Sequence, residues 1–251
     1  MIGVIAGATF REAVRSRAFA GLLGLFGLAV VLSRVVGWIS GTDGNIVTAN
    51  LVMSLQSVIG VLVAVATGTA LVQTEIQQRT LYTLLSRPVR RWQYVVGKYA
   101  GLAAALAFGQ AAMIAIGLGY LGITGAPLSG WMVVAGMLTG IEVLVMAAVS
   151  LCLTALTSPL LATALCLAVY ALGHAVGELP KLMYHLHGFQ AQACVGLAAL
   201  VPDLSRFAYR DQAVHGLPID ALDLALRIAY GGLWIALLVT ITISVIRRKQ
   251  L

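Results

Sequence analysis

The sequence predicts an all-α polytopic membrane protein, a single domain over residues 1–251 with six transmembrane helices. Three observations predict this class. Hydrophobic residues make up 60% of the chain and charged residues only 10%, whereas a soluble domain carries about 25% charged residues. Several apolar runs are long enough to cross a bilayer, and the basic residues gather in segments that would lie on one side. The net charge of +7 does not indicate a nucleic-acid-binding protein, because such a protein would not be this apolar.

Six apolar windows have the length of about 20 residues that a spanning helix needs. The first window is too long for the core of a cleaved signal peptide, so we expect it to stay in the protein. A shorter apolar stretch at 189–201 is expected to lie at the interface or to re-enter the membrane. The predicted spans are 18–39, 51–72, 99–122, 131–156, 160–179 and 228–246.

Polar connections separate these spans. The stretches 40–50 and 123–130 are short and rich in turn-forming residues, so we expect loops there. The segment 180–227 is the one sizeable outer element, and we expect it to be helical in part. Within it, Pro202 followed by Asp203 predicts the start of a helix.

The distribution of Lys and Arg predicts the orientation, because cytoplasmic loops carry an excess of both. With both termini in the cytoplasm, the inner segments contain eleven of the sixteen Lys and Arg residues, and the outer loops 40–50 and 123–130 contain none. A seventh span would move the basic C-terminus to the other side and weaken this bias. The inner segments are then 1–17, 73–98, 157–159 and 247–251.

The N-terminal segment predicts a helix that lies along the inner face of the membrane. It is short and mixed in character, and it ends in a basic cluster. Its arginines can reach lipid phosphates, and they also help to fix the topology. The residues that define this helix are Phe10, Arg11, Glu12, Arg15 and Arg17.

The stretch "EIQQRTLYTLLSRPVRRWQYVVGK" at 75–98 is a dense polar segment between two apolar runs. The part from Glu75 to Leu85 predicts a short amphipathic helix, which Pro88 ends. Arg90, Arg91 and Lys98 hold the loop inside and anchor the third span. A purely topological loop needs only charge, whereas this one also presents an apolar face, which predicts a docking partner. The residues of this docking face are Glu75, Ile76, Arg79, Thr80, Leu81, Leu84, Leu85, Pro88 and Arg91.

Three polar residues lie inside predicted spans, namely Gln110, Glu142 and His174. A charged group at such depth is costly and marks a functional site by default. Two roles stay open for Glu142, which is either protonated and hydrogen-bonded to Gln110 or lines a pathway. For Gln110 and His174 a structural role is favoured. Several glycines in the spans permit close contact between helices, and for most of them we expect a packing role alone. These are Gly60, Gly68, Gly117, Gly119, Gly136, Gly140, Gly173 and Gly177.

No motif in the sequence predicts catalysis. Gly97-Lys98 lacks the upstream glycine of a phosphate-binding loop. His185 and His187 are too weak a pair to predict a metal site. We therefore expect a protein that is not an enzyme and binds neither a metal nor a cofactor of its own.

The polar stretch resembles the cytoplasmic signature of ABC-2 type permeases, the membrane subunits of ATP-binding-cassette exporters. In that family an acid precedes Gly-Thr-Leu, a Leu-Leu-x-x-Pro segment, a basic residue and Gly-Lys. Arg79 stands where the family usually has Gly. The matching positions are Glu75, Thr80, Leu81, Leu84, Leu85, Pro88, Arg91, Gly97 and Lys98.

The resemblance extends over most of the chain. The stretch "TFREAVRSRAF" resembles the amphipathic "elbow" helix that precedes the first span of these permeases. The closest group is the one named for multicopper-enzyme maturation. The resemblance implies a bacterial inner-membrane location, a separate cytoplasmic ATPase dimer that holds ATP and Mg, and a coupling helix between spans two and three. It also implies a second permease copy, identical or related.

Two other classes of function stay open beside an exporter subunit. A self-contained secondary transporter would show inverted repeats, broken spans and several buried ionisable groups, whereas Glu142 is nearly alone here. A membrane scaffold or maturation factor would use the outer segment 180–227 to recruit an extracytoplasmic partner. This third role is compatible with the first.

Overall fold

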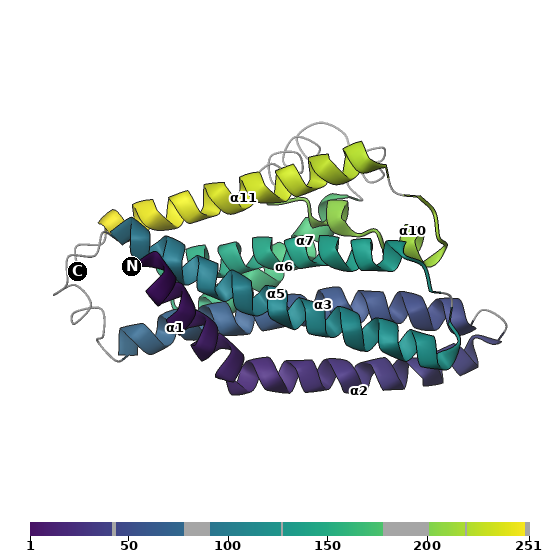
Figure 1. The fold of residues 1–251 in the computed structure, drawn as a ribbon. Coiled ribbons are helices and arrows are strands. Elements are labelled where there is room, and N and C mark those ends of the chain that lie inside the picture. Colours follow the sequence, from purple (N-terminus) through teal and green to yellow (C-terminus); the bar gives the residue numbers. More distant parts are fainter. Residues whose placement is uncertain (42–43, 78–90, 127, 178–200, 219, 249–251) are drawn as a thin grey trace.

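The computed structural model describes residues 1–41, 44–77, 91–126, 128–177, 201–218 and 220–248, and all its regular elements in these ranges are helical. Six of the described helices are long and apolar enough to cross a membrane, as the sequence predicts. They run side by side as an elongated bundle (Figure 1). The six are α2 (Arg17–Ile39), α3 (Gly44–Gln77), α5 (Arg91–Thr124), α6 (Trp131–Leu156), α7 (Pro159–Val176) and α11 (Ala221–Arg248).

Three of these helices begin well before the predicted spans. α3 starts at Gly44 rather than at 51, α5 at Arg91 rather than at 99, and α11 at Ala221 rather than at 228. The prediction of a loop over 40–50 is therefore wrong for 44–50, which are helical. The prediction that 221–227 belong to the outer segment is also wrong, since they form the start of α11. An apolar window marks only the part of a helix that suits lipid, whereas backbone hydrogen bonds continue into polar flanks until the chain must turn.

The turn between α2 and α3 is tight because two glycines meet there. A Cβ on Gly44 would lie 2.3 Å from the carbonyl oxygen of Gly37. Gly41 has a φ of +67°, which an L side chain rarely adopts. These glycines let α3 begin almost directly after α2 ends.

The two central helices are α3 and α6. Their apolar windows are 61% and 67% buried, compared with 11% for α11 and 17% for α7. Glycines allow the close approach, since a Cβ on Gly68 would lie 2.1 Å from Ser150 Oγ and one on Gly60 would lie 2.8 Å from Val143 Cγ2. Gly119, expected to be one of the packing glycines, faces open space instead.

α1 (Ile2–Arg15) is a separate helix that crosses one end of the bundle (Figure 1). Ser16 has an extended backbone and separates α1 from α2, and its Oγ accepts a hydrogen bond from the Phe19 N–H at 3.1 Å. A Cβ on Gly101 of α5 would lie 2.4 Å from the carbonyl oxygen of Ala6. The α1 backbone therefore rests directly on α5.

Two short elements, here called the cap, precede α11: η2 (Leu204–Phe207) packs against α6 and α7, and α10 (Arg210–Val214) packs against α3 and α6. Asp203 is the N-cap residue of η2, which confirms the helix start predicted at Pro202 and Asp203. Leu204 and Phe207 are fully buried. They pack beside glycines, Leu204 against Gly173 of α7 and Phe207 against Gly231 of α11.

Polar contacts attach this cap to α11. The Asp203 N–H donates to Tyr230 Oη at 2.8 Å, and the Tyr209 hydroxyl donates to the Asp223 carboxylate. Asp223 also forms an ion pair with Arg227 at 2.9 Å. The cap and the first turns of α11 are thus joined by several directed bonds.

We expect Gly101→Ala to destabilise the bundle, because the new methyl group would meet the α1 backbone at 2.4 Å and that backbone cannot move without shifting α1. The expected loss is roughly 1–3 kcal/mol of the free energy of unfolding, typical of an overpacked contact. Thermal unfolding in detergent measures this change.

Gly119→Ala is the matched control, since it lies on the same helix and its new Cβ would have no neighbour within 4 Å. We expect it to be neutral or to stabilise by up to about 1 kcal/mol, because Ala favours helix over Gly. Equal melting temperatures for the two variants would contradict the close contact between α1 and α5.

Candidate functional site

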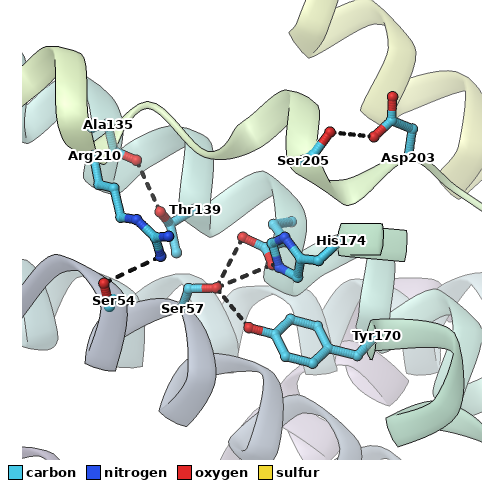
Figure 2. A network of polar contacts seen from close by, with 10 residues as sticks. Ser54, Ser57, Ala135, Thr139, Tyr170, His174, Asp203, Ser205 and Arg210 are labelled. Atoms are coloured by element: carbon cyan, nitrogen blue, oxygen red, sulfur yellow. Dashed lines mark hydrogen bonds and ion pairs between the residues drawn. The ribbon is translucent and has the colours of Figure 1, made fainter. Parts of the chain in front are cut away.

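A buried polar cluster joins three of the spanning helices (Figure 2). Ser57 comes from α3, Glu142 from α6, and Tyr170 and His174 from α7. The four side chains form a continuous chain of hydrogen bonds. Side-chain hydrogen bonds of this kind hold transmembrane helices together, since a polar group without a partner is costly in lipid.

Glu142 is the centre of the cluster. It lies twelve residues into the 26-residue α6 and is only 1% exposed. Ser57 Oγ lies 3.1 and 3.2 Å from its two carboxylate oxygens, and His174 Nε2 lies 2.9 Å from Oε1. A carboxyl group at this depth persists because both neighbours bond it. In this arrangement Glu142 ties α6 to α3 and to α7.

The direction of the hydrogen bonds follows from the number of protons. Ser57 has a single hydroxyl proton and donates it to Glu142, so the Tyr170 hydroxyl, 3.1 Å away, donates to Ser57. The Tyr170 and His174 rings also meet edge to face, with centroids 4.8 Å apart. In this order the Tyr170 hydroxyl donates to Ser57, and the Ser57 hydroxyl donates to Glu142. The contact between His174 and Glu142 is the third bond of the cluster.

The cluster reaches the surface of the bundle on the α7 side. The His174 side chain is 32% exposed, whereas that of Glu142 is 2% exposed. Arg210 of α10 approaches from the cap and donates from Nη1 to Ser54 Oγ at 3.2 Å (Figure 2). Ser54 lies one helical turn before Ser57, so the Arg210 charge lies near the cluster.

Gln110 is not the partner of Glu142 that the sequence suggested. It lies on α5 against Gly60 of α3 and Gly140 of α6, and its Nε2 has no hydrogen-bond partner among the described residues. The Glu142 carboxylate instead forms its hydrogen bonds with Ser57 and His174. The sequence did not indicate Ser57, because a serine in an apolar span usually bonds its own helix backbone. No pattern in the sequence marked Tyr170.

The predicted docking residues fall mostly outside the described part of the chain. Glu75 and Ile76 belong to the last turn of α3, and Arg91 begins α5. The structure therefore describes the two helices that flank the docking segment. The docking residues outside the described ranges are Arg79, Thr80, Leu81, Leu84, Leu85 and Pro88.

The residues of the predicted N-terminal helix divide into two groups. Phe10 packs on Phe108 of α5, with ring centroids 6.5 Å apart in a T-shaped pair. The charged residues Arg11, Glu12, Arg15 and Arg17 are exposed. α1 thus has one face on the bundle and one charged face away from it.

No metal-binding group is found in the described ranges, where no three His, Cys, Asp or Glu side chains lie close enough to hold an ion. The cluster around Glu142 contains one carboxyl group and one imidazole only. Its geometry is that of a tie between helices.

A double-mutant cycle tests the tie. We expect Glu142→Gln and His174→Phe to be coupled by about 0.5–1.7 kcal/mol in the free energy of unfolding, the range measured for hydrogen bonds between membrane helices. Reversible unfolding in bicelles measures each variant and the double variant.

Glu142→Gln combined with Tyr120→Phe is the control cycle, because Tyr120 bonds the Val31 carbonyl oxygen and belongs to a different contact. We expect these two changes to be additive within about 0.5 kcal/mol. Additivity in the Glu142 and His174 cycle as well would refute the tie.

Comparison with known proteins gives the family. No curated protein matches the chain. A family model described as ABC-2 family transporter protein matches residues 4–246, which include five of the six spanning helices in full and nearly all of α11. The chain therefore belongs to the ABC-2 transporter family and is a multi-pass permease, the membrane component of an ABC transporter.

Proposed function

We propose that this chain is the transmembrane permease subunit of an ATP-binding-cassette exporter. A separate cytoplasmic ATPase docks on the segment 75–91, and ATP hydrolysis on that partner drives export through the membrane subunits. The observation that supports this most is the family match over 4–246. The residues at 75–98 that resemble the family's cytoplasmic signature support the position of the docking segment.

The described helices suit such a docking segment. α3 ends at Gln77 and α5 begins at Arg91, so the segment between them joins one central helix of the bundle to the helix that carries α1. An ATPase shifts the permease between two states only if it binds them with different affinity. A segment attached to both helices can transmit that difference directly to the core.

The charges support a location with both termini in the cytoplasm of a bacterium. α1, the end of α3, the start of α5 and the end of α11 all lie at one end of the bundle (Figure 1). This end carries the exposed arginines Arg11, Arg15 and Arg17 as well as Arg247. The positive-inside rule places such an end on the cytoplasmic side. In this orientation α1 acts as the elbow helix on the inner leaflet.

The proposed assembly contains a second permease copy, identical or related, and an ATPase dimer that binds ATP and Mg. The membership of the multicopper-enzyme-maturation group, and an extracytoplasmic partner for the segment 180–227, belong to the same proposal. The group membership rests on the resemblance of the sequence, and the partner rests on 180–227 being the one sizeable outer segment.

The docking face is tested by changing its apolar residues. We expect Leu81→Asp with Leu84→Asp to abolish co-purification of the ATPase, because two carboxylates would be buried without partners at the contact. The affinity should fall by at least about a hundredfold. A pull-down of the tagged permease with the co-expressed ATPase measures it.

Leu217→Asp is the control, because Leu217 is an exposed leucine in the turn before α11, at the other end of the bundle. It adds a carboxylate of the same kind, one negative charge where the test variant adds two, and we expect it to leave the complex intact. An ATPase that still binds and is still stimulated after both changes at 81 and 84 would refute docking at this segment.

A further inference from the structure

Lys98 of α5 is buried inside the bundle, with only 4% of its surface exposed. Its Nζ donates to the carbonyl oxygen of Leu71 in α3 at 3.0 Å and to the Tyr94 hydroxyl at 3.3 Å. The ammonium group also lies 5.6 Å from the centre of the Tyr94 ring. The charged group of Lys98 thus lies in the contact between α5 and α3.

This position differs from the one that topology alone requires. Lysine is almost never fully buried unless it is paired, because removing the ammonium from water is costly. A lysine that only fixes orientation, or anchors a span, can extend to the lipid headgroups. Lys98 instead turns inward, and so the charge has a function within the protein.

A neighbouring face of the same turn of α5 carries α1, since Gly97 and Gly101 lie within about 100° of Lys98 around the helix. A Cβ on Gly97 would lie 3.0 Å from Ile5 Cβ, and one on Gly101 would lie 2.4 Å from the Ala6 carbonyl oxygen. Residues 97–101 of α5 therefore contact both α1 and α3. One turn of helix connects three elements at this end of the bundle.

The contact lies close to both helices that flank the segment 78–90. Leu71 precedes the end of α3 by six residues, and Lys98 follows the start of α5 by seven. At 1.5 Å per residue, the contact is about 9 Å from one helix end and about 10 Å from the other. The bond therefore joins α3 and α5 roughly two helical turns away from the ends at which they meet the segment 78–90.

We propose that Lys98 is a positioning residue for energy coupling. Its bond to Leu71 makes α3 and α5 move as one body when the segment between them is displaced, and α1 follows through Gly97 and Gly101. This rests on the proposed function, in which that segment receives the ATPase. Without this bond, the end of α3 and the start of α5 can move independently. A displacement of the segment then does not reach the central helices α3 and α6.

The variant Lys98→Met separates this role from folding. Met has a similar length and no charge. The Leu71 carbonyl oxygen lies within α3 and keeps its helical hydrogen bond, so no buried carbonyl is left without a partner. Arg34→Met is the matched control, since it also removes one positive charge but breaks a contact with Asn45 at the opposite end of the bundle.

The experiment uses the complex of permease and ATPase in nanodiscs. Spin labels at Ala70→Cys of α3 and Ala100→Cys of α5, both exposed positions, report the distance between the two helices. The native cysteines are first replaced by Ala. ATP hydrolysis is measured on the same samples as a maximal stimulated rate and a KM for ATP.

We expect Lys98→Met to keep the ATPase bound and its KM unchanged, to broaden the distance distribution between α3 and α5, and to lower the stimulated rate about tenfold, the size of one charged hydrogen bond. Arg34→Met should change none of these. Where Lys98→Met does not yield a monodisperse protein, Lys98→Gln is used in its place.

Two results separate the proposal from the function on which it rests. An unchanged distance distribution together with an unchanged rate overturns the role of Lys98. An ATPase that fails to co-purify with the unaltered permease overturns the docking function instead. In that case the distance measurement on the permease alone still decides whether Lys98 holds α3 to α5.

Discussion

The close approach of α3 and α6 is the contact on which the rest of the bundle depends. Gly60 and Gly68 let side chains of α6 reach the α3 backbone, and this brings Ser57 within hydrogen-bond distance of Glu142. Gln110 of α5 packs against Gly60 of α3 and Gly140 of α6, and His174 of α7 bonds Glu142 of α6. In lipid no hydrophobic effect drives helices together, so packing of small residues and directed bonds decide which helices touch.

Two buried polar groups stabilise this core at different levels. The Glu142 cluster ties α3, α6 and α7 below the cap, and Lys98 ties α5 to α3 at the end that carries α1. The apolar windows of α2 and α11 are only 22% and 11% buried, so both helices are largely exposed.

The sequence predicted the existence and order of the six spans well, because a long apolar run has few other stable states in a membrane. It predicted their ends less well, as at Gly44 and Ala221, where polar residues continue a helix that lipid does not require. It identified Glu142 and His174 as unusual, but the one partner it offered for Glu142 was Gln110, whereas the structure shows Ser57 and His174. It assigned Lys98 to holding the loop inside and anchoring the third span, and it did not predict that the side chain is buried.

Composition, apolar windows and charge bias by themselves determined the fold class, the number of spans and the predicted orientation, and the residues at 75–98 indicated the family. Only the tertiary structure decided which polar side chains meet. The reason is that a spanning helix is apolar on all sides, so its sequence hardly shows which face is turned to a neighbour. The rotation of α6 that directs Glu142 to Ser57 and His174, and that of α5 that directs Lys98 to Leu71, follow from glycine contacts between helices distant in the chain.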